Sequence, residues 1–215
     1  MKLNQKNWSD PNKIQSRREN IIIPYREHIA NKLLPLKQFW TLSGQCTDGN
    51  NPLEGCELLQ MIEEQFITPD QYRGVELTPE IYKMNKLVYP NIQFINDDFY
   101  SAMKQSYQNN EFNPGIVNFD STYLPERGIT YLSDILYFLT DINIKQVLLI
   151  GNFAKMNPYG GHKRHEPNDM IKYLKKNDRF KYSFLKGGWK YYLISTTYKC
   201  KKSRTPFMSI SFYRN

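Results

Sequence analysis

The sequence predicts an α/β domain with a doubly wound, mostly parallel sheet that ends in an antiparallel β-hairpin. Short apolar strand patterns alternate with helical patterns through most of the chain, which is typical of parallel sheets. The strand expected at residues 146–150 is almost entirely apolar, as in a sheet buried on both faces. Two long strand patterns, at 189–198 and 206–213, are adjacent in the sequence and predict the terminal hairpin.

Length and composition indicate one domain. A chain of 215 residues is long enough for a substantial core. We expect an N-terminal arm and helix over residues 1–36 and the α/β domain over 37–215. The sequence has no apolar run of membrane-spanning length and a polar start, so we expect a cytoplasmic protein without membrane contact. The three cysteines show no metal spacing, which predicts reduced thiols and no metal site.

The N-terminal segment divides into two parts. Residues 1–20 are rich in Asn and Gln and predict a loosely ordered arm. Residues 25–34 place Tyr25, Ile29 and Leu33 on one stripe, which predicts a helix that covers the sheet.

The next segment carries the pattern of a nucleotide-binding half-site. A strand at 39–42 leads into Ser43, Gly44 and a glycine-bearing loop, and a helical pattern follows from residue 54. A second strand at 72–75 ends at Glu76 and Leu77, where open α/β sheets bind their ligands. Glu76 is suited to accept hydrogen bonds from ribose hydroxyls. Alternatively, the glycines form a simple turn and Glu76 is a solvated loop residue, but the order of the parts favours the nucleotide site.

A second acid follows the third strand. Thr78 and Pro79 start a helix that runs to about residue 88, and a strand is expected at 91–95. Asp98 and Phe99 come next, a carboxylate beside an aromatic ring, which suits an adenine. The alternative is that Asp98 caps the helix expected at 99–108.

The remaining elements complete the alternation. A fourth strand at 115–119 leads into Asp120 and, three residues on, Tyr123. A helix at 129–140 precedes the strand at 146–150, and another helix is expected near 168–176.

Positive charge is concentrated in the C-terminal part. The formal net charge is +8, and residues 155–215 hold 15 of the 29 Lys and Arg but only 3 of the 21 Asp and Glu. This asymmetry favours a polyanionic partner, DNA or RNA, over lysines that only confer solubility, although the sequence leaves both open. The candidate phosphate contacts lie in the loop after the fifth strand and in the hairpin turn: Lys163, Arg164, Lys199, Lys201, Lys202 and Arg204.

Taken together, these features resemble a class I S-adenosylmethionine-dependent methyltransferase, over residues 37–215. The resemblance rests on the strand and helix order, on acids after the second and third strands and on the terminal hairpin. It implies a Rossmann-like fold and S-adenosylmethionine as cofactor. The methionine part would contact Ser43 and Gly44, the ribose would contact Glu76 beside Leu77, and the adenine would contact Asp98 and Phe99. The family favours an acid and a G-x-G near the first strand. The loop of this chain, SGQCTDGNNPLEG, departs from that pattern because it is longer and its glycines are spread out.

The residues after the fourth strand resemble those of methyltransferases that act on amines of nucleic-acid bases. Such enzymes carry Asp or Asn, two prolines and an aromatic residue, and here Asp120 and Tyr123 keep the ends of that motif without the prolines. Asp120 would orient the acceptor amine, and Tyr123 would stack on the base. The alternative is an Asp-Ser-Thr turn.

Two other functions remain open from the sequence. A nicotinamide enzyme has the same architecture, but the G-x-G-x-x-G expected after the first strand is absent. The second is an inactive methyltransferase-like module that binds nucleic acid or a protein partner, which the divergent loop favours.

Overall fold

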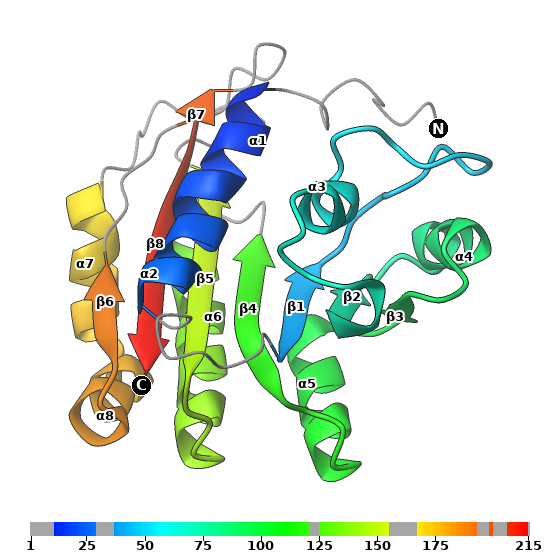
Figure 1. Ribbon diagram of the computed structural model, residues 1–215. Coiled ribbons are helices and arrows are strands. Elements are labelled where there is room, and N and C mark those ends of the chain that lie inside the picture. The colour runs from blue at the N-terminus through cyan, green and yellow to red at the C-terminus, as the bar shows by residue number, and fades with distance from the viewer. Residues whose placement is uncertain are drawn as a thin grey trace.

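One sheet organises the protein. In the computed structural model, which describes residues 11–28, 37–120, 125–154, 167–192, 198–199 and 206–214, eight strands pair in the order β3-β2-β1-β4-β5-β8-β6, with β7 on β8 (Figure 1). The strands are β1 (Gln38–Leu42), β2 (Tyr72–Val75), β3 (Gln93–Ile95), β4 (Pro114–Asp120), β5 (Val147–Ala154), β6 (Lys190–Tyr192), β7 (Tyr198–Lys199) and β8 (Pro206–Arg214).

The direction of the strands divides the sheet into two parts. Strands β1 to β5 pair in parallel, whereas β8 runs antiparallel to β5, β6 and β7. The strand order reverses between β1 and β4, because the chain first builds outward to β3 and then returns to the other side of β1. In open α/β sheets, ligands bind at such a reversal, outside the carboxyl ends of the strands.

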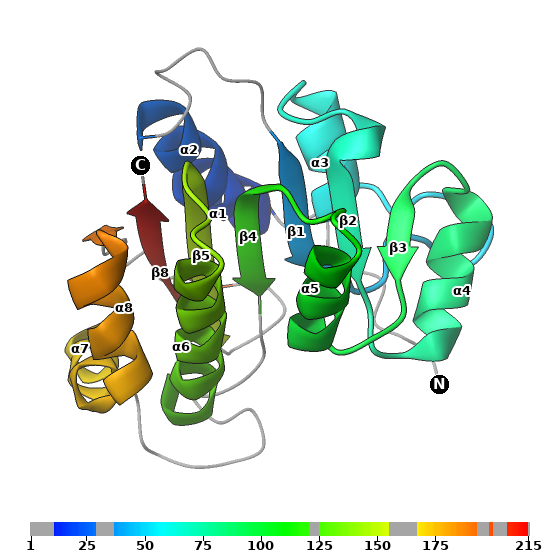
Figure 2. The ribbon, with the colours of Figure 1, turned by 90° about the horizontal axis from the view of Figure 1, so that it is seen from below.

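Helices cover both faces of the sheet. Figures 1 and 2 show α1, α2 and α3 on one face, here called the α3 face, and α5, α6, α7 and α8 on the other, the α6 face. The helices are α1 (Pro11–Arg17), the π-helix η2 (Arg18–Ile22), α2 (Ile23–His28), α3 (Glu57–Glu63), the 3₁₀ helix η4 (Pro69–Gln71), α4 (Pro79–Val88), α5 (Phe99–Gln108), α6 (Pro125–Asp141), α7 (Pro167–Lys176) and α8 (Asp178–Gly187). Within the described residues, none of these helices is long and apolar enough to span a bilayer.

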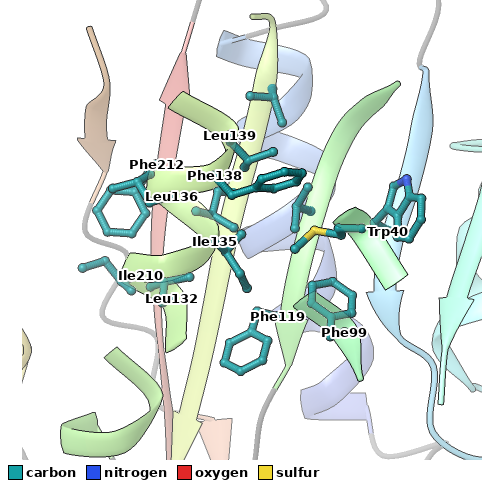
Figure 3. Packing of buried hydrophobic residues seen from close by; sticks show 14 of the residues in the cluster. Trp40, Phe99, Phe119, Leu132, Ile135, Leu136, Phe138, Leu139, Ile210 and Phe212 are labelled. Carbon is teal, nitrogen blue, oxygen red and sulfur yellow. The ribbon is translucent and has the colours of Figure 1, made fainter. Parts of the chain in front are cut away.

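The core of the α6 face is built from large apolar side chains. Trp40 and Phe119 reach this face from β1 and β4 and pack with Ile135 and Leu139 of α6 (Figure 3). All four side chains are buried. Burial of this kind contributes roughly 1.5–3 kcal/mol per large apolar side chain, so this core is a major source of stability.

The α3 face has an apolar core in its lower half and polar residues above it. Phe39, Ile116 and Leu148 pack with Ile21 and Tyr25 of the N-terminal helices. Because side chains alternate between the faces of a strand, the residues two and four positions further along the same strands also face this side. Ile150, two positions after Leu148, still belongs to the apolar core. The other positions toward the carboxyl ends of these strands carry polar side chains, namely Thr41, Asn118, Asp120 and Asn152.

The predicted fold class is confirmed: the sheet is mostly parallel, with an antiparallel edge. Strand β2 and helix α5 have the predicted bounds, and the two terminal strand patterns form antiparallel strands that pair through β8. Helix α8 was not predicted, and α3 begins at Glu57 rather than at residue 54 because Cys56 is its extended N-cap residue.

The prediction for the N-terminal segment is wrong where the structure describes it. Residues 11–22 form α1 and η2 rather than a loose arm, and the helix expected at 25–34 runs from Ile23 to His28 within the described range. The segment is ordered because Ile21 and Ile22 are buried in the α3-face core and Arg18 forms a salt bridge of 2.8 Å with Glu64. The domain boundary after residue 36 stays a prediction.

Candidate active site

The loop after β1, residues 43–56, begins in a conformation that helix α4 fixes. The Ser43 amide donates to the Val75 carbonyl at 3.0 Å, which extends the β1–β2 pairing. Gly44 follows with φ of 55°, a conformation that favours glycine. The buried side chain of Asn85 accepts from the Cys46 amide at 2.9 Å and donates to the Gly44 carbonyl at 2.7 Å. The loop is therefore held by α4 without the glycine pattern that the family favours.

Glu76 and Leu77 lie where β2 ends. Glu76 is half-buried, and its Oε1 accepts from the Thr78 amide at 2.8 Å. The Thr78 side chain forms no capping bond, so the expectation that it caps α4 is wrong, while Pro79 does occupy the first helical position. Leu77 is 68% exposed, which leaves an apolar surface beside the carboxylate.

Asp98 and Phe99, after β3, both have structural contacts. Asp98 caps α5, because its Oδ1 accepts from the amides of Tyr100 and Ser101 at 3.0 and 3.2 Å, and its Oδ2 accepts from the Tyr131 hydroxyl. Phe99 is 2% exposed, and its ring lies 6.0 Å from that of Phe119 in the α6-face core (Figure 3). The alternative in which Asp98 acts as a cap is confirmed. A contact of either side chain with an adenine stays a prediction.

A polar pocket lies beside the strand reversal, between the N-terminal helices and the carboxyl ends of β4 and β5. The sheet contributes Asn118, Asp120 and Asn152 to its lining, and α3 contributes Glu57. Helix α1 and η2 form the opposite wall, with Lys13 and Arg17 from α1 and Ser16, Asn20 and Ile21 beside them. The pocket has a volume of about 20 Å³, enough for one water molecule or the tip of a ligand.

Hydrogen bonds connect the polar residues beneath the pocket into one chain. The Ser209 hydroxyl donates to Asn152 Oδ1, and Asn152 Nδ2 donates to Asn118 Oδ1 at 3.2 Å. Asn118 Nδ2 in turn donates to Glu57 Oε2 at 2.8 Å. Each donor points toward Glu57, so the chain supports a carboxylate at that position.

Burial dominates the electrostatics of Glu57. Its side chain is 7% exposed, and this burial raises the pKa of its carboxyl to about 7. The positive charge of Arg17 and the polar side chains of Thr41 and Asn118 oppose the rise in this pKa, and the charge of Asp120 adds to it. Glu57 therefore changes its charge near neutral pH.

Asp120 ends β4 at the mouth of the pocket. It keeps contact with solvent, but the protein that surrounds its carboxyl raises its pKa above the ordinary value for an aspartate. The charges of Lys13 and Arg17 oppose that rise. The N-terminal helix thus faces both pocket carboxyls with cations.

Arg17 also attaches this helix to α3. Its guanidinium donates to the Gly55 carbonyl at 2.9 Å and to Gln60 Oε1 at 3.0 Å. Gln60 Nε2 donates back to the Ile14 carbonyl at 3.0 Å. These bonds fix the wall of the pocket against the helix that carries Glu57.

The structure brings several of the predicted site residues to one edge of the sheet. Ser43 and Gly44 follow β1, Glu76 follows β2, Asp98 follows β3 and Asp120 ends β4, and these four parallel strands are neighbours. The backbone of Lys199 reaches the same edge, because β7 pairs with the start of β8, where Phe207 lies opposite Ala154 at the end of β5. The remaining predicted residues lie outside the described part of the chain: Tyr123, Lys163, Arg164, Lys201, Lys202 and Arg204.

Sequence reasoning missed the pocket residues around Asp120. Asn118 and Asn152 interrupt strands that are otherwise almost entirely apolar, and buried polar residues in such strands are a signal of a site. An acidic residue in a helical pattern predicts a solvated side chain, whereas Glu57 is buried beside Lys13 and Arg17 of the N-terminal helix. No sequence pattern indicated that Lys13 and Arg17 would reach this site.

Comparisons with known proteins concern the fold. No protein-family model and no curated protein matches the chain. The methyltransferase domain of bacterial CtHen1-CN superposes with a TM-score of 0.52 and 10% sequence identity, covering 93% of this chain and 99% of that one. A TehB-like SAM-dependent methyltransferase from Corynebacterium glutamicum matches with a TM-score of 0.44 and 12% identity, over 95% of this chain and 97% of that one. The CurJ carbon methyltransferase matches with a TM-score of 0.44 and 9% identity, over 85% of this chain and 50% of that one.

Similarity at such low identity concerns architecture alone. The superposition with the CtHen1-CN domain extends over nearly the full length of both chains. The chain therefore has a class I methyltransferase-like fold.

Proposed function

We propose that the protein is an S-adenosylmethionine-dependent methyltransferase that acts on an amine, with a nucleic-acid base as the acceptor. One observation carries the proposal: Glu76 follows β2 and Asp120 ends β4, so the two residues lie at the same edge of the sheet on either side of β1. A cofactor half-site and an acceptor half-site are therefore neighbours.

The residues at the ends of β1 and β2 fit the cofactor. Glu76 offers a carboxylate for the ribose hydroxyls, and exposed Leu77 offers an apolar surface for the adenine. Ser43 and Gly44 would hold the methionine part. When bound, S-adenosylmethionine supplies a methyl group on a sulfonium, which is electrophilic.

Asp120 would hold the acceptor. Its carboxylate accepts a hydrogen bond from the amine N–H and so orients the nitrogen lone pair toward the methyl carbon. Bound S-adenosylmethionine would supply the methyl group and leave as S-adenosylhomocysteine, and the surplus proton of the product would pass to solvent beside Asp120. Positioning of this kind contributes several kcal/mol to catalysis. Tyr123 would stack on the base.

Calorimetry with S-adenosylmethionine and S-adenosylhomocysteine tests the cofactor assignment. We expect both to bind, and Glu76→Ala to weaken binding at least tenfold, because a hydrogen bond to a charged group contributes about 1.5–3 kcal/mol. Glu80→Ala is the matched control, since Glu80 is an exposed acid in the first turn of α4. If the wild-type protein and Glu76→Ala bind the cofactor with equal affinity, Glu76 does not contact the cofactor.

Transfer of a labelled methyl group to DNA and RNA tests the reaction. Asp120→Ala is expected to lower kcat about a hundredfold with little change in cofactor affinity. Tyr123→Ala is expected to weaken acceptor binding by about 1–3 kcal/mol. Transfer that survives Asp120→Ala would place catalysis elsewhere.

The position of Lys199 supports nucleic acid as the partner. Its backbone lies at the same edge of the sheet as Asp120, and Lys201, Lys202 and Arg204 follow it in the sequence. If Lys199, Lys201, Lys202 and Arg204 each neutralise one phosphate, the slope of log K against log salt on duplex DNA should be near −3.6, about 0.9 for each contact. Alanine at these four positions should flatten the slope, whereas alanine at Lys175 and Lys176 of α7 serves as the control. A salt-independent affinity would exclude these contacts.

A binding module without catalysis is the second candidate. The internal bonds of the β1 loop favour it, because Asn85 and Val75 already engage backbone groups of the residues that would hold the methionine part. If the protein binds nucleic acid in a salt-dependent manner but does not bind S-adenosylmethionine, it is a binding module rather than an enzyme.

A further inference from the structure

One oxygen of the Glu57 carboxyl has no partner. Oε2 accepts from Asn118 Nδ2 at 2.8 Å, but Oε1 is fully buried and makes no hydrogen bond to any described residue. Buried carboxyl oxygens are rarely left without a donor, because the cost is about 1–3 kcal/mol or more for a charged group. The side chain lines the polar pocket, so a donor within the pocket would satisfy it.

The surroundings of Glu57 fix the direction of its carboxyl. Asn118 receives a hydrogen bond from Asn152 and passes one to Oε2, so this oxygen is held toward the sheet. Asn152 is in turn held by the Ser209 hydroxyl. The chain of bonds therefore engages Oε2 and leaves Oε1 as the carboxyl oxygen without a donor among the described residues.

The charges around the pocket indicate the kind of group that fits. Two acids, Glu57 and Asp120, face two cations of the N-terminal helix, Lys13 and Arg17. With these charges balanced, a neutral donor enters at a lower electrostatic cost than an ammonium ion or an anion. The volume of about 20 Å³ admits only the tip of a larger molecule.

We propose that this pocket receives the neutral N–H group of the methyl acceptor, an amino group conjugated to a ring as in adenine or cytosine, with Glu57 Oε1 as a second hydrogen-bond acceptor beside Asp120. The proposal rests on the proposed function and names the residue that would select the acceptor group. Glu57 binds and orients the acceptor, and it takes no part in bond formation.

Glu57→Gln is the direct test, because the amide keeps the shape of the side chain. Its oxygen is expected to accept from Asn118, and its NH₂ then faces the pocket, where it opposes an incoming donor. We expect the KM for the nucleic-acid acceptor to rise at least tenfold while the affinity for S-adenosylhomocysteine stays unchanged. Glu63→Gln is the matched control, since Glu63 is an exposed acid on the same helix.

A second variant separates binding from folding. Glu57→Asp keeps a carboxyl but withdraws it from the pocket, so a smaller rise in KM is expected than for Glu57→Gln. Urea unfolding of Glu57→Gln and of Glu57→Asp, followed by circular dichroism, shows whether each variant remains folded. Unchanged KM in folded Glu57→Gln would overturn the proposal while leaving the methyltransferase assignment intact.

A binding measurement distinguishes failure of the inference from failure of the proposed function. With S-adenosylhomocysteine present in excess, adenine and cytosine are compared with purine and pyrimidin-2-one, which lack the amino group. We expect calorimetric binding of the amino compounds to wild type and to Glu63→Gln, and at least tenfold weaker binding to Glu57→Gln. If the protein shows this binding pattern but transfers no methyl group, the pocket binds amino groups as inferred and the proposed methyltransferase activity is rejected. Equal binding of all four probes, or no binding of any, would mean that the pocket holds water only and would overturn the inference.

Discussion

The two faces of strands β4 and β5 differ in chemistry, although alternate residues of the same two strands build both. On the α6 face, Val117, Phe119 and Leu149 enter an apolar core. On the α3 face, Asn118 lies between Val117 and Phe119 in the strand, and Asn152 lies opposite Asp120. These two asparagines form hydrogen bonds that end at Glu57. The apolar face therefore stabilises the sheet, whereas the polar face gives up apolar burial for a hydrogen-bonded pocket. Departures of this kind from apolar burial are typical of functional sites.

The N-terminal segment makes this division possible. Without α1 and η2, the polar carboxyl ends of β4 and β5 would be open to solvent, where Glu57 would keep an ordinary pKa. Their presence turns an open strand end into a pocket with a buried carboxyl. A π-helix such as η2 is uncommon and is frequent at functional sites, in agreement with its position in the pocket wall.

The largest effect should come from the apolar face. Phe119 is 2% exposed, and its ring stacks on that of Tyr131 with centroids 5.0 Å apart. Phe119→Ala should lower the free energy of unfolding by about 3–5 kcal/mol, the usual cost of removing a buried ring. Urea denaturation measures the change. A loss below about 1 kcal/mol would contradict the assignment of this face as the main source of stability.

Glu57→Gln should raise the free energy of unfolding, whereas Phe119→Ala lowers it, and the size of the increase should depend on pH. Because the pKa of Glu57 is raised from 4.5 to about 7 in the folded state, the folded protein binds this proton more tightly than the unfolded chain does. The stability contributed by the proton is complete below pH 4.5 and is lost as the pH rises through 7, a change of roughly 3 kcal/mol. The glutamine variant should lack this loss and should be more stable than wild type at pH 8.

The same comparison at pH 4 and pH 8 provides the control. Wild type and Glu57→Gln should differ much less at pH 4, where Glu57 is protonated in both states. Glu63→Gln, on the exposed side of α3, should follow the wild-type pH dependence. An equal difference between wild type and Glu57→Gln at both pH values would refute the raised pKa.

Arg17→Gln tests the wall of the pocket with an intermediate effect. Loss of its bonds to Gly55 and Gln60 should cost about 1–3 kcal/mol, and the pKa of Glu57 should rise further because the charge of Arg17 lowers it. Urea denaturation and carboxyl ¹³C NMR measure the two effects. Arg18→Gln, which removes only the exposed pair with Glu64, should cost less than about 1 kcal/mol. If the pKa of Glu57 is equal in Arg17→Gln and Arg18→Gln, the charge of Arg17 does not act on Glu57, and α1 has no electrostatic effect on the pocket.

The smallest effect is expected at Asp98, away from the polar pocket. Asp98→Ala removes the cap of α5 and should cost about 1 kcal/mol of stability. Calorimetry of cofactor binding to the same variant distinguishes a role of Asp98 as a helix cap from a role in binding the adenine. A loss of stability alone would leave Asp98 as a cap, whereas an additional tenfold loss of affinity would support its contact with the adenine.

The sequence by itself determined most of the secondary structure and the direction of the sheet. The apolar run of β5 and the alternation of strands with amphipathic helices are local patterns, so they predicted β1 to β5 and α4 to α6 within a few residues. The sequence also predicted that the acids at the ends of β2 and β4 lie at one edge of the sheet, because the carboxyl ends of parallel strands share one edge in a doubly wound fold. Glu76 and Asp120 were found in this way.

Only the tertiary structure decided which residues share the pocket. Glu57 and Asn118 are 61 positions apart, and Arg17 is 40 positions before Glu57, so no periodicity relates them. The burial of Glu57 depends on the docking of α1 and η2 on the sheet, since the same carboxyl on an uncovered helix would be a solvated acid. Burial is a property of packing between distant segments, and for that reason the raised pKa and the unpartnered oxygen of Glu57 became visible only once the chain was folded.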